Sequence, residues 1–236
     1  MTWDKGPLLG FDLETTGVDP SSDVPVQVAL VRWETLRRSY REVFIVDPER
    51  DIPPAAQAIH GISTRRARQE GCPLAEAAAI VHAALARAQA DHLPVVVMNA
   101  SFDITIAAAL FRSFRLRPIL WEALVDPLVI DRQVDPYRSG KRRLDILCRL
   151  YGVELSSPHD AGSDADATVA IARAIAGRYP EIAACEITDL TRSQAGWHRS
   201  WALEYDAWCR ENGKAGLTPE EFSWPLREVL NPHLAA

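Results

Sequence analysis

Two acidic residues, Asp12 and Glu14, stand at the end of an apolar run from Leu8 to Phe11. Residues two apart on a strand point to the same face of a sheet, so these carboxylates are expected side by side. Two carboxylates this close do not both stay ionised easily unless a cation is near. Carboxylate oxygens suit Mg²⁺ or Mn²⁺ better than zinc, which prefers nitrogen and sulfur. The pair therefore indicates a divalent metal site, with solvated acids at a strand end as the alternative.

Two further acids, Asp103 and Asp164, occur in contexts that favour the same site. Asp103 falls in the first turn of a predicted helix, just after a buried strand, where α/β sheets collect their ligands. An acid there is also a common partner of the helix dipole. Asp164 follows His159 by five residues across the start of the last long helix, so both side chains can converge beside that helix N-terminus. Each residue alone indicates little, and the set is the signal.

Hydrophobic patterns and chain breakers predict the elements that must position these residues. Three alternating strands with short links open the chain and favour an antiparallel meander. Short apolar runs then alternate with helices, which is the rhythm of an α/β fold. The predicted strands are 8–14, 26–33, 40–46, 95–98 and 120–125. The predicted helices are 55–60, 64–70, 74–90, 102–112, 127–134, 144–151, 160–179 and 189–212.

Composition and charge exclude several classes of protein. No apolar run approaches the roughly 20 residues of a membrane helix, and the start lacks the features of a signal peptide, so we expect no membrane association and a cytoplasmic protein. The four cysteines form no Cys-x-x-Cys pair, which argues against zinc and disulfides and for buried thiols. A net charge of −6 argues against coating nucleic acid by bulk electrostatics. The arginine clusters are interpreted first as solvated faces, including the most basic one, 138–143.

The composition shifts beyond Pro180, and four of the seven tryptophans lie between positions 197 and 224. Aromatic residues recur at spacings of four, four and three on one helix and form a stripe: Trp197, Trp201, Tyr205 and Trp208. The favoured interpretation is that the stripe docks this helix on the catalytic body. The alternative is a partner or single-stranded nucleic acid stacked on the rings. We expect a catalytic domain at 1–180 and a Trp-rich helical C-terminal extension at 181–236, whose tail from 219 onwards is too irregular to assign.

Taken together, the acids resemble the three motifs of the DEDDh (DnaQ-like) 3′–5′ exonucleases, the family of the proofreading ε subunit of bacterial DNA polymerase III. The first motif is Phe-Asp-Leu-Glu-Thr-Thr-Gly at 11–17, and the second is Asn-Ala-Ser-Phe-Asp at 99–103. The third is His159 with Asp164, followed by Ala-x-Ala-Thr. The resemblance covers roughly residues 8–178. Met98 and Gln27 replace a histidine and a glutamate that many members carry, and neither change removes a catalytic group.

The resemblance implies an RNase H-like fold, a mixed sheet of about five strands flanked by helices. It also implies release of nucleoside 5′-monophosphates from a 3′ end. Two Mg²⁺ or Mn²⁺ ions would clamp the scissile phosphate, one activating the attacking water and the other stabilising the leaving oxygen. Their ligands would be four carboxylates: Asp12, Glu14, Asp103 and Asp164. His159 would take the proton of the water, since histidine changes protonation near neutral pH, and such bases are worth ~10² to 10⁴ in rate.

Substrate contacts follow from the same resemblance, at Leu13, Thr15, Thr16, His60 and Phe102. The two threonines would meet the terminal 3′-hydroxyl. His60 and Phe102 would line the pocket of the terminal nucleotide, with Phe102 stacking on a base or wedging it. Loop capping is the alternative role for His60. These contacts use features common to all nucleotides, so low sequence specificity is expected.

Several functional alternatives stay open at this level. The partner is single-stranded or 3′-end nucleic acid, with DNA favoured over RNA; an RNA-directed enzyme resembling oligoribonuclease or RNase T is the first alternative. A non-catalytic polymerase-associated adapter is the second, although a pure binder has no use for uncompensated carboxylates facing phosphates. An association with DNA polymerase III is possible, but no convincing clamp-binding peptide or long tethering linker is present, which favours a stand-alone nuclease. The oligomeric state stays open.

Overall fold

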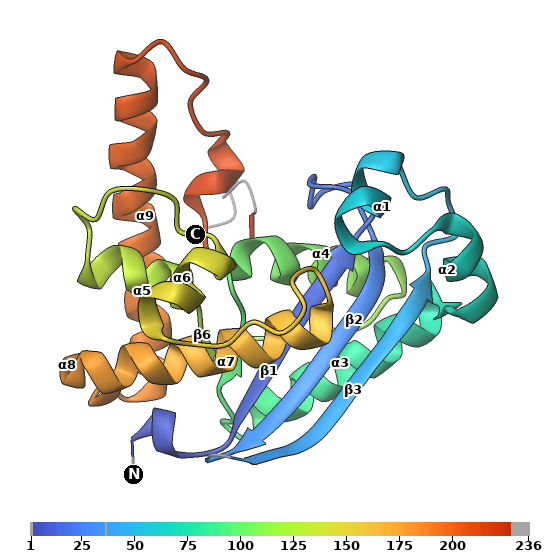
Figure 1. Ribbon diagram of the computed structural model, residues 1–236, viewed down its shortest axis with the longest axis horizontal. Coiled ribbons are helices and arrows are strands. Elements are labelled where there is room, and N and C mark those ends of the chain that lie inside the picture. The colour runs from blue at the N-terminus through green and yellow to red at the C-terminus, as the bar shows by residue number, and fades with distance from the viewer. Residues whose placement is uncertain (1, 36, 228–236) are drawn as a thin grey trace.

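The computed structural model describes residues 2–35 and 37–227. Its centre is a mixed sheet with the strand order β4-β3-β2-β1-β5-β6 (Figure 1). The strands are β1 (Leu8–Thr15), β2 (Pro25–Glu34), β3 (Arg37–Asp47), β4 (Cys72–Pro73), β5 (Val95–Val96) and β6 (Leu124–Val125). β1, β2 and β3 form the antiparallel meander, while β4, β5 and β6 run parallel to their neighbours.

This sheet confirms the RNase H-like prediction, with one strand more than the five expected. The additional strand is β4, which pairs with the end of β3. Two residues cannot show the alternation by which a strand is recognised in a sequence. The last predicted strand is also shorter than expected, because only Leu124–Val125 of the range 120–125 pairs with β5. The prediction erred where hydrophobic patterns are shortest.

All eight predicted helices are present, and their ends shift by no more than two residues. They are α1 (Pro54–His60), α2 (Thr64–Glu70), α3 (Leu74–Ala90), α4 (Ala100–Ser113), α5 (Pro127–Val134), α6 (Leu144–Tyr151), α7 (Ala161–Arg178) and α9 (Ile187–Glu211). A one-turn helix that the sequence analysis missed, α8 (Pro180–Ala183), separates α7 from α9. Two 3₁₀ turns complete the described chain, Trp3–Lys5 and Pro219–Phe222. The rest of the unassigned tail, 228–236, lies outside the described residues.

Helices cover both faces of the sheet, and β1 lies in the sheet between the two layers of helices (Figure 1). Alternate residues of β1, such as Leu9 and Phe11, join a core with α3 and α4. On the opposite face α7 lies directly on β1 at Gly10, where a Cβ atom would come within 2.9 Å of the Ala165 carbonyl oxygen. Glycine is needed at this position because two backbones approach closely. The same face continues to Asp12 and Glu14, so β1 presents both acids toward the start of α7.

The C-terminal helix α9 covers the outer edge of β6. Gln194 accepts a hydrogen bond from the Asp126 amide at 2.6 Å and donates one to the Leu124 carbonyl at 2.8 Å. Thr191 accepts from the Leu124 amide at 3.0 Å. Backbone groups at a sheet edge need such partners when they are buried. The division of the chain at residue 180 remains a prediction, and side chains beyond it complete the edge of the sheet.

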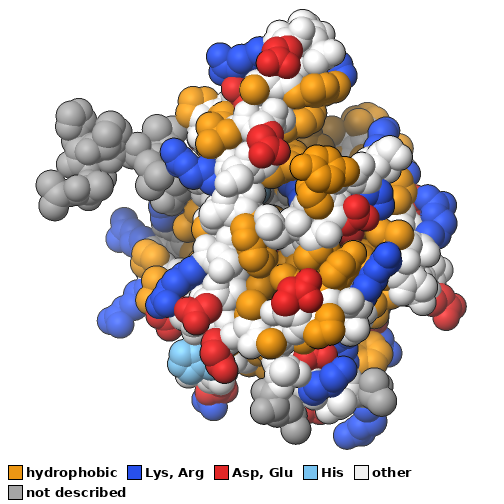
Figure 2. All heavy atoms as spheres, turned by 90° about the vertical axis from the view of Figure 1, so that its left-hand side faces the viewer, with side chains coloured by type: hydrophobic (Ala, Val, Ile, Leu, Met, Phe, Trp, Pro, Cys, Tyr) orange, Lys and Arg blue, Asp and Glu red, His pale blue; other side chains and the backbone are white. Residues whose placement is uncertain are grey.

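The aromatic stripe on α9 divides into two parts. Trp197 packs against the cores on both sides of the sheet, as the docking interpretation predicted. Tyr205 and Trp208 remain 39% and 45% exposed. The rings engage one another: Trp201 and Tyr205 stack at 5.2 Å between centroids, and Tyr205 and Trp208 at 6.0 Å. Figure 2 shows hydrophobic side chains among both charges near the top of this face, where α9 ends.

Two cations extend this stack and bear on the alternative that nucleic acid stacks on the rings. The Arg132 guanidinium lies 3.4 Å from the centre of the Trp201 ring, and the Lys214 amine lies 4.0 Å from that of Trp208. Every ring of the stack therefore has two partners already, either neighbouring rings or a ring and a cation. Bases need free ring faces for stacking. The structure thus offers little support for the nucleic-acid interpretation of this stripe.

The basic cluster 138–143 has a structural role. Arg138 and Arg142 both pair with Asp131, whose side chain is fully buried. A buried carboxylate needs such partners, since an unpaired charge is costly away from water. These arginines stabilise the loop after α5. In the described part of the chain, no helix is both long enough and apolar enough to cross a membrane. All four cysteines are free thiols, Cys148 and Cys209 buried and Cys72 and Cys185 partly so.

Candidate active site

The first motif ends β1, at a place where the strand pairing is irregular. Asp12 is partly exposed and Glu14 is buried, and both lie on the face that α7 covers. The register between β1 and β2 shifts between Glu14 and Thr15. Such bulges re-aim side chains next to active sites. Leu13 between the acids is buried on the opposite face, and its backbone amide donates to the Asp103 carboxylate at 3.0 Å.

That hydrogen bond links β1 to α4, which carries the second motif. Asp103 lies in the first turn of α4 and is only 4% exposed. The chain enters α4 through Asn99, a residue with positive φ (58°), and no side chain of the motif caps the helix. The amides of Asn99 and Ala100 instead donate to the carboxylate of Asp126, at 3.0 and 2.9 Å. A residue distant in sequence therefore satisfies the first amides of α4.

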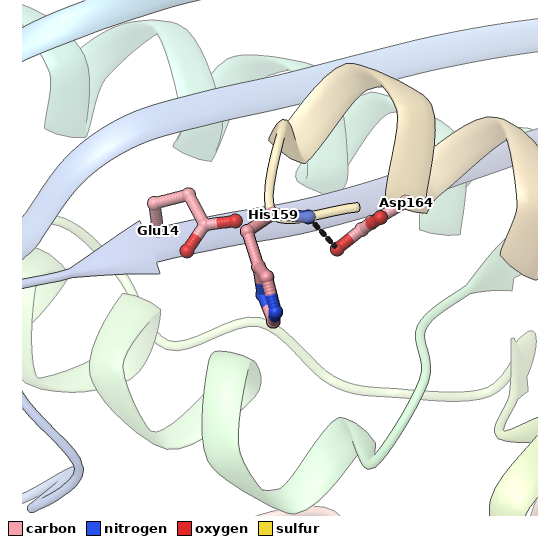
Figure 3. A group of neighbouring side chains, drawn as sticks. All are labelled: Glu14, His159 and Asp164. Atoms are coloured by element: carbon pink, nitrogen blue, oxygen red, sulfur yellow. Dashed lines mark hydrogen bonds between the residues drawn. The ribbon is translucent and has the colours of Figure 1, made fainter. Parts of the chain in front are cut away.

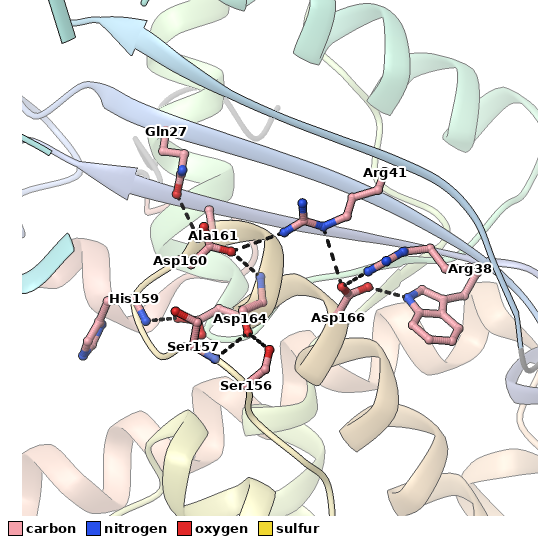
Figure 4. Close-up of polar contacts among 12 residues, drawn as sticks. Gln27, Arg38, Arg41, Ser156, Ser157, His159, Asp160, Ala161, Asp164 and Asp166 are labelled. Carbon is pink, nitrogen blue, oxygen red and sulfur yellow. Dashed lines mark hydrogen bonds and ion pairs between the residues drawn. The ribbon is translucent and has the colours of Figure 1, made fainter. Parts of the chain in front are cut away.

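The third motif is held by a separate network at the start of α7, drawn in Figure 4. Asp160 accepts a hydrogen bond from the Ser163 amide at 2.9 Å and pairs with Arg41 of β3 at 3.3 Å. Gln27 accepts one from the Ala161 amide at 3.0 Å. Gln27 stands opposite Glu14 in the sheet, and its amide oxygen accepts from the first amide of α7. This network fixes the helix turn that presents Asp164.

His159 lies on the loop immediately before α7. Its backbone adopts positive φ (64°), and its amide donates to Asp164 at 3.2 Å. The loop is also held by Ser163, whose hydroxyl contacts the Ser156 hydroxyl at 2.8 Å and accepts from the Ser157 amide at 3.0 Å. The side chain of His159 is exposed, and the backbone around it is fixed. This is the arrangement expected for a group that exchanges protons with water at a fixed position.

Three of the five predicted catalytic residues form one compact group, shown in Figure 3. Ligand atoms of Glu14, His159 and Asp164 all lie within 4.8 Å of one another. Asp12 and Asp103 lie close to this group, because repulsion from Asp103, Asp164 and Glu14 raises the pKa of Asp12 and repulsion from Glu14 raises that of Asp103. The structure therefore brings the predicted residues together at the meeting point of β1, α4 and α7. Their catalytic roles remain predictions.

Burial and mutual repulsion raise the pKa of every carboxylate in the site. Burial, and next the neighbouring Asp164, raise the pKa of Glu14 to about 7. Burial raises the pKa of Asp164 to about 6, although the His159 amide opposes the shift. Burial and then repulsion from Asp103 hold the pKa of Asp12 well above its usual range. Burial does the same for Asp103 against the opposing hydrogen bond from Leu13. Cations would reverse these shifts.

The donor set fits a divalent metal ion. It consists of carboxylate oxygens with one histidine, and hard oxygen ligands suit Mg²⁺ and Mn²⁺. Asp164 Oδ1 is buried and has no hydrogen-bond partner, which leaves it available to a cation. The group of ligand atoms that could hold an ion contains Glu14 and Asp164 with His159, so the predicted ligands Asp12 and Asp103, like the identity of the metal, stay predictions.

A cleft of about 470 Å³ opens beside Glu14, and all five predicted substrate residues line it. The hydroxyls of the two threonines are engaged within its wall. Thr15 Oγ1 donates to the Gly17 carbonyl at 2.6 Å, and Thr16 Oγ1 donates to Asp23 at 2.6 Å. These bonds shape the loop after β1. Contact with a 3′-hydroxyl through these side chains would require the hydroxyls to exchange partners.

His60 has one ring nitrogen engaged and one without a partner. Nδ1 accepts a hydrogen bond from the Ile62 amide at 3.1 Å, which is the loop-capping role named as the alternative. Nε2 is buried and unpartnered. Burial lowers the pKa of His60 against an opposing backbone hydrogen bond with Thr15, and because Nδ1 accepts from the Ile62 amide, the neutral ring carries its proton on Nε2. Loop capping leaves this donor available, so His60 can cap the loop and still contact a ligand.

Sequence reasoning assigned no role to Gln27, Asp160 or Asp126, which hold the catalytic helices in place. Asp160 could have been found, because an aspartate just before a predicted helix is a common N-cap. Gln27 and Asp126 reach amides more than 25 residues away in sequence, at 161 and 99. Spacing carries no signal for such contacts.

Comparisons with known proteins agree with this geometry. A family model described as "Exonuclease" matches residues 9–172. Exodeoxyribonuclease I of Escherichia coli is 29% identical over 199 residues, which cover 75% of this chain and 42% of the relative. DNA polymerase III subunit epsilon of Rickettsia felis is 27% identical over 166 residues, covering 67% of this chain and 68% of the relative.

Solved structures give the same result. E. coli exonuclease I in complex with a dT13 oligonucleotide superposes with a TM-score of 0.62 at 27% identity, over 75% of this chain and 42% of that one. Its complex with dA16 gives a TM-score of 0.64 at 26% identity, over 82% and 44%. The chain thus spans less than half the length of exonuclease I. The matched family segment contains all five predicted catalytic residues, and the chain belongs to the DnaQ-like DEDDh exonuclease family.

Proposed function

We propose that this chain is a metal-dependent 3′–5′ exonuclease that releases nucleoside 5′-monophosphates, with single-stranded DNA as the favoured substrate. The observation that carries the proposal is the convergence of Glu14, His159 and Asp164 within 4.8 Å, beside a cleft that Glu14 also lines. Asp12 and Asp103 add two further carboxylates to this site. Support for DNA comes from E. coli exonuclease I, solved with dT13 and dA16 oligonucleotides.

The four carboxylates would hold two divalent ions, Mg²⁺ or Mn²⁺. When bound, such ions neutralise charge on the scissile phosphate and favour deprotonation of the attacking water. The chain supplies the geometry: β1 fixes Asp12 and Glu14, the Leu13 amide fixes Asp103, and the α7 network fixes Asp164. Without these links, charge repulsion would move the four carboxylates away from one another. The fold therefore holds the acids close together against their mutual repulsion.

His159 is proposed as the general base. It would accept the proton of the attacking water as the new bond from water oxygen to phosphorus forms and the bond from phosphorus to the 3′-oxygen breaks. Its exposed ring allows the proton to pass on to solvent. Its backbone bond to Asp164 keeps it beside the acids. A base must lie within hydrogen-bond reach of the proton that it removes, and this loop geometry supports that placement.

The terminal nucleotide is proposed to lie in the cleft lined by Leu13, His60 and Phe102. The cleft wall is largely apolar, which suits a base or sugar face, and the His60 Nε2–H is a donor for an oxygen of the sugar or phosphate. Phe102 lies in the first turn of α4, next to Asp103. None of these groups reads a base edge specifically, so cleavage should depend little on sequence.

The decisive experiment is degradation of a 3′-overhang DNA by the purified protein with Mg²⁺ or Mn²⁺, with products identified chromatographically. We expect 5′-monophosphates, no activity in chelator, and none in Asp12→Ala. The exposed acid Asp51, 83% accessible and paired with Arg68, provides the matched control Asp51→Ala, which should retain activity. Activity that persists in chelator or in Asp12→Ala would reject the metal mechanism. Inactivity of the wild-type protein toward every 3′ end would favour the adapter hypothesis.

Matched DNA and RNA oligonucleotides test the polymer preference. We expect faster degradation of DNA, and faster degradation of RNA would transfer the proposal to the oligoribonuclease-like alternative. We further propose that the chain acts on its own, despite its similarity to epsilon subunits. Co-purification of a stable complex with a replicative polymerase would overturn this second proposal and leave the chemistry unchanged.

A further inference from the structure

The carboxylate of Asp126 is a buried hub for four N–H donors. The backbone amides of Asn99, Ala100 and Leu128 donate to it at 2.9 to 3.0 Å. The fourth donor is the indole Nε1 of Trp224, at 3.2 Å, which comes from the segment after α9. Both side chains are buried, Asp126 at 1% exposure and Trp224 at 8%. The C-terminal segment therefore inserts a side chain into the inside of the catalytic body.

This hub determines how the chain enters α4. Asn99 adopts a left-handed conformation, with φ 58° and ψ 49°, which asparagine tolerates better than most residues other than glycine and which its surroundings select here. The surroundings here are the Asp126 oxygens, which accept from Asn99 and from the first helical amide. Asp103 follows Asn99 by four residues, so the entry geometry sets where its carboxylate meets the Leu13 amide.

The C-terminal segment makes further contacts with the same unit. The Arg227 backbone amide donates to Thr105 Oγ1 at 2.9 Å, and its side chain reaches Ser101 Oγ at 3.4 Å. From the other side, Gln194 of α9 accepts from the Asp126 amide. Both α4 and the residue that caps it are thus held by side chains and backbone from beyond residue 180.

Loss of the indole donor would weaken the hub in a specific way. Burial raises the pKa of Asp126, and hydrogen bonds from Ala100, Trp224 and Asn99 oppose that shift. Removing one of these donors favours the protonated acid. A protonated carboxyl is a poorer acceptor for the remaining amides, so Asn99 and Ala100 are held less tightly. The effect passes to Asp103 through one turn of helix.

We infer that Trp224 is a positioning residue of the active site, which holds Asp103 in place through Asp126 and the start of α4. The inference rests on the proposed function for its kinetic consequence, and its structural part stands alone. Trp224 is not among the residues that line the cleft beside Glu14. Its role is to keep the metal-binding carboxylate of α4 in register with those of β1.

The test is Trp224→Phe, which keeps an aromatic ring and removes the N–H. We expect kcat to fall and Mn²⁺ affinity, measured by calorimetry, to weaken, each by about 3- to 10-fold. This effect is at or below the low end of what the loss of a residue that holds a metal ligand usually costs. Hydrogen exchange of the Ala100 amide should accelerate more than that of Ile171 in the middle of α7. The matched control is Trp208→Phe, the same substitution at a ring 45% exposed on the same extension, which should change none of these quantities.

A second control separates positioning from general stability. Ile175→Val removes one buried methylene from the core face of α7 and should lower the unfolding temperature without changing Mn²⁺ affinity. Unchanged Mn²⁺ affinity and unchanged Ala100 exchange in Trp224→Phe would overturn the inference. An inactive wild-type protein would reject the proposed function, whereas the calorimetric and exchange measurements would still decide the role of Trp224.

Discussion

The starts of α4 and α7 perform the same task by different means. Each helix presents one acid of the site from its first turn, Asp103 or Asp164. The α7 start is capped locally by Asp160, one residue before the helix, and its contact with Arg41 is partly exposed, at 36% and 38%. The α4 start is capped from a distance by Asp126, which is buried. The difference shows that similar motifs in one site can depend on very different parts of the chain.

This difference has energetic and functional consequences. An exposed cap has water as a substitute, and its loss is partly compensated. A buried cap has none, so each unpaired amide there costs a full desolvation penalty. We therefore expect mutations around α7 to act mainly on chemistry, through His159 and Asp164, and mutations around α4 to act on stability and chemistry together.

The largest expected effect belongs to the α7 side and concerns chemistry alone. His159→Ala should lower kcat by ~10² to 10⁴, the usual contribution of a general base. Its backbone bond to Asp164 does not depend on the side chain, so Mn²⁺ affinity measured by calorimetry should change little. An unchanged rate would show that His159 is not the base. A large loss of metal affinity would show that it acts as a ligand of the ion.

The next prediction compares the same substitution, aspartate to asparagine, at the residues that cap α4 and α7. Asp126→Asn leaves one oxygen for four donors and turns an NH₂ toward two of them, so we expect a loss of about 3 kcal/mol in the free energy of unfolding. Asp160→Asn should cost less than about 0.5 kcal/mol, because asparagine caps helices as well as aspartate. Urea unfolding of both variants measures the difference. Equal losses would show that the two helix starts are held alike.

The same contrast explains how far the sequence could predict the site. The first-turn acids and His159 were predicted as a set from three local motifs that resemble the DEDDh exonucleases, whereas the period of a strand explains why Asp12 and Glu14 share a face. The convergence of Glu14 with Asp164 follows from Gly10, which lets α7 lie on the same face of β1. Helices α5 and α6 were found with their bounds because proline and glycine mark their ends.

What the sequence could not supply are contacts between distant segments. Trp224 belongs to the tryptophan-rich region that the composition revealed. Nothing in the sequence indicated that its indole reaches Asp126, 98 residues earlier. Likewise, four stripe aromatics predicted one docked face, whereas Trp208 turns out 45% exposed, because α9 extends past the body that covers its first half. Periodicity describes one helix, and the extent of its neighbour decides how much of it is buried.

A pH measurement sharpens the electrostatic side of the comparison. In the metal-free protein the pKa of Glu14 rises from about 4.5 to about 7, so between these values the folded state binds more protons than the unfolded state. Stability therefore falls as pH rises through this window, by about 3 kcal/mol for Glu14. Asp164 contributes in the same direction between 3.8 and about 6. Glu14→Gln should remove the part of this pH-dependent decrease in stability that Glu14 causes.

Metal-free Glu14→Gln should therefore be more stable than the wild-type protein at pH 8 and no more stable at pH 4.5, by urea unfolding at both values. Addition of Mg²⁺ at pH 8 should stabilise the wild-type protein more than the variant, since the ion replaces the protons that the acids have lost. If the free energies of unfolding of the wild-type protein and the variant differ by the same amount at pH 4.5 and pH 8, the pKa of Glu14 is not raised by burial and neighbouring charges.

A small effect is also expected for Arg41, the partner of Asp160. Arg41→Ala removes an ion pair with Asp160 at 3.3 Å, whose two side chains are more than a third exposed, and a longer one with Asp166 at 3.9 Å, so the loss should be less than about 1 kcal/mol in low salt. The loss should be smaller still in about 0.5 M salt, because the screening length there is only a few ångströms. The amides of Ala161 and Ser163 keep their partners Gln27 and Asp160, so the start of α7 persists. A loss as large as that of Asp126→Asn would mean that the α7 start also depends on one buried interaction, and the contrast between the helices would disappear.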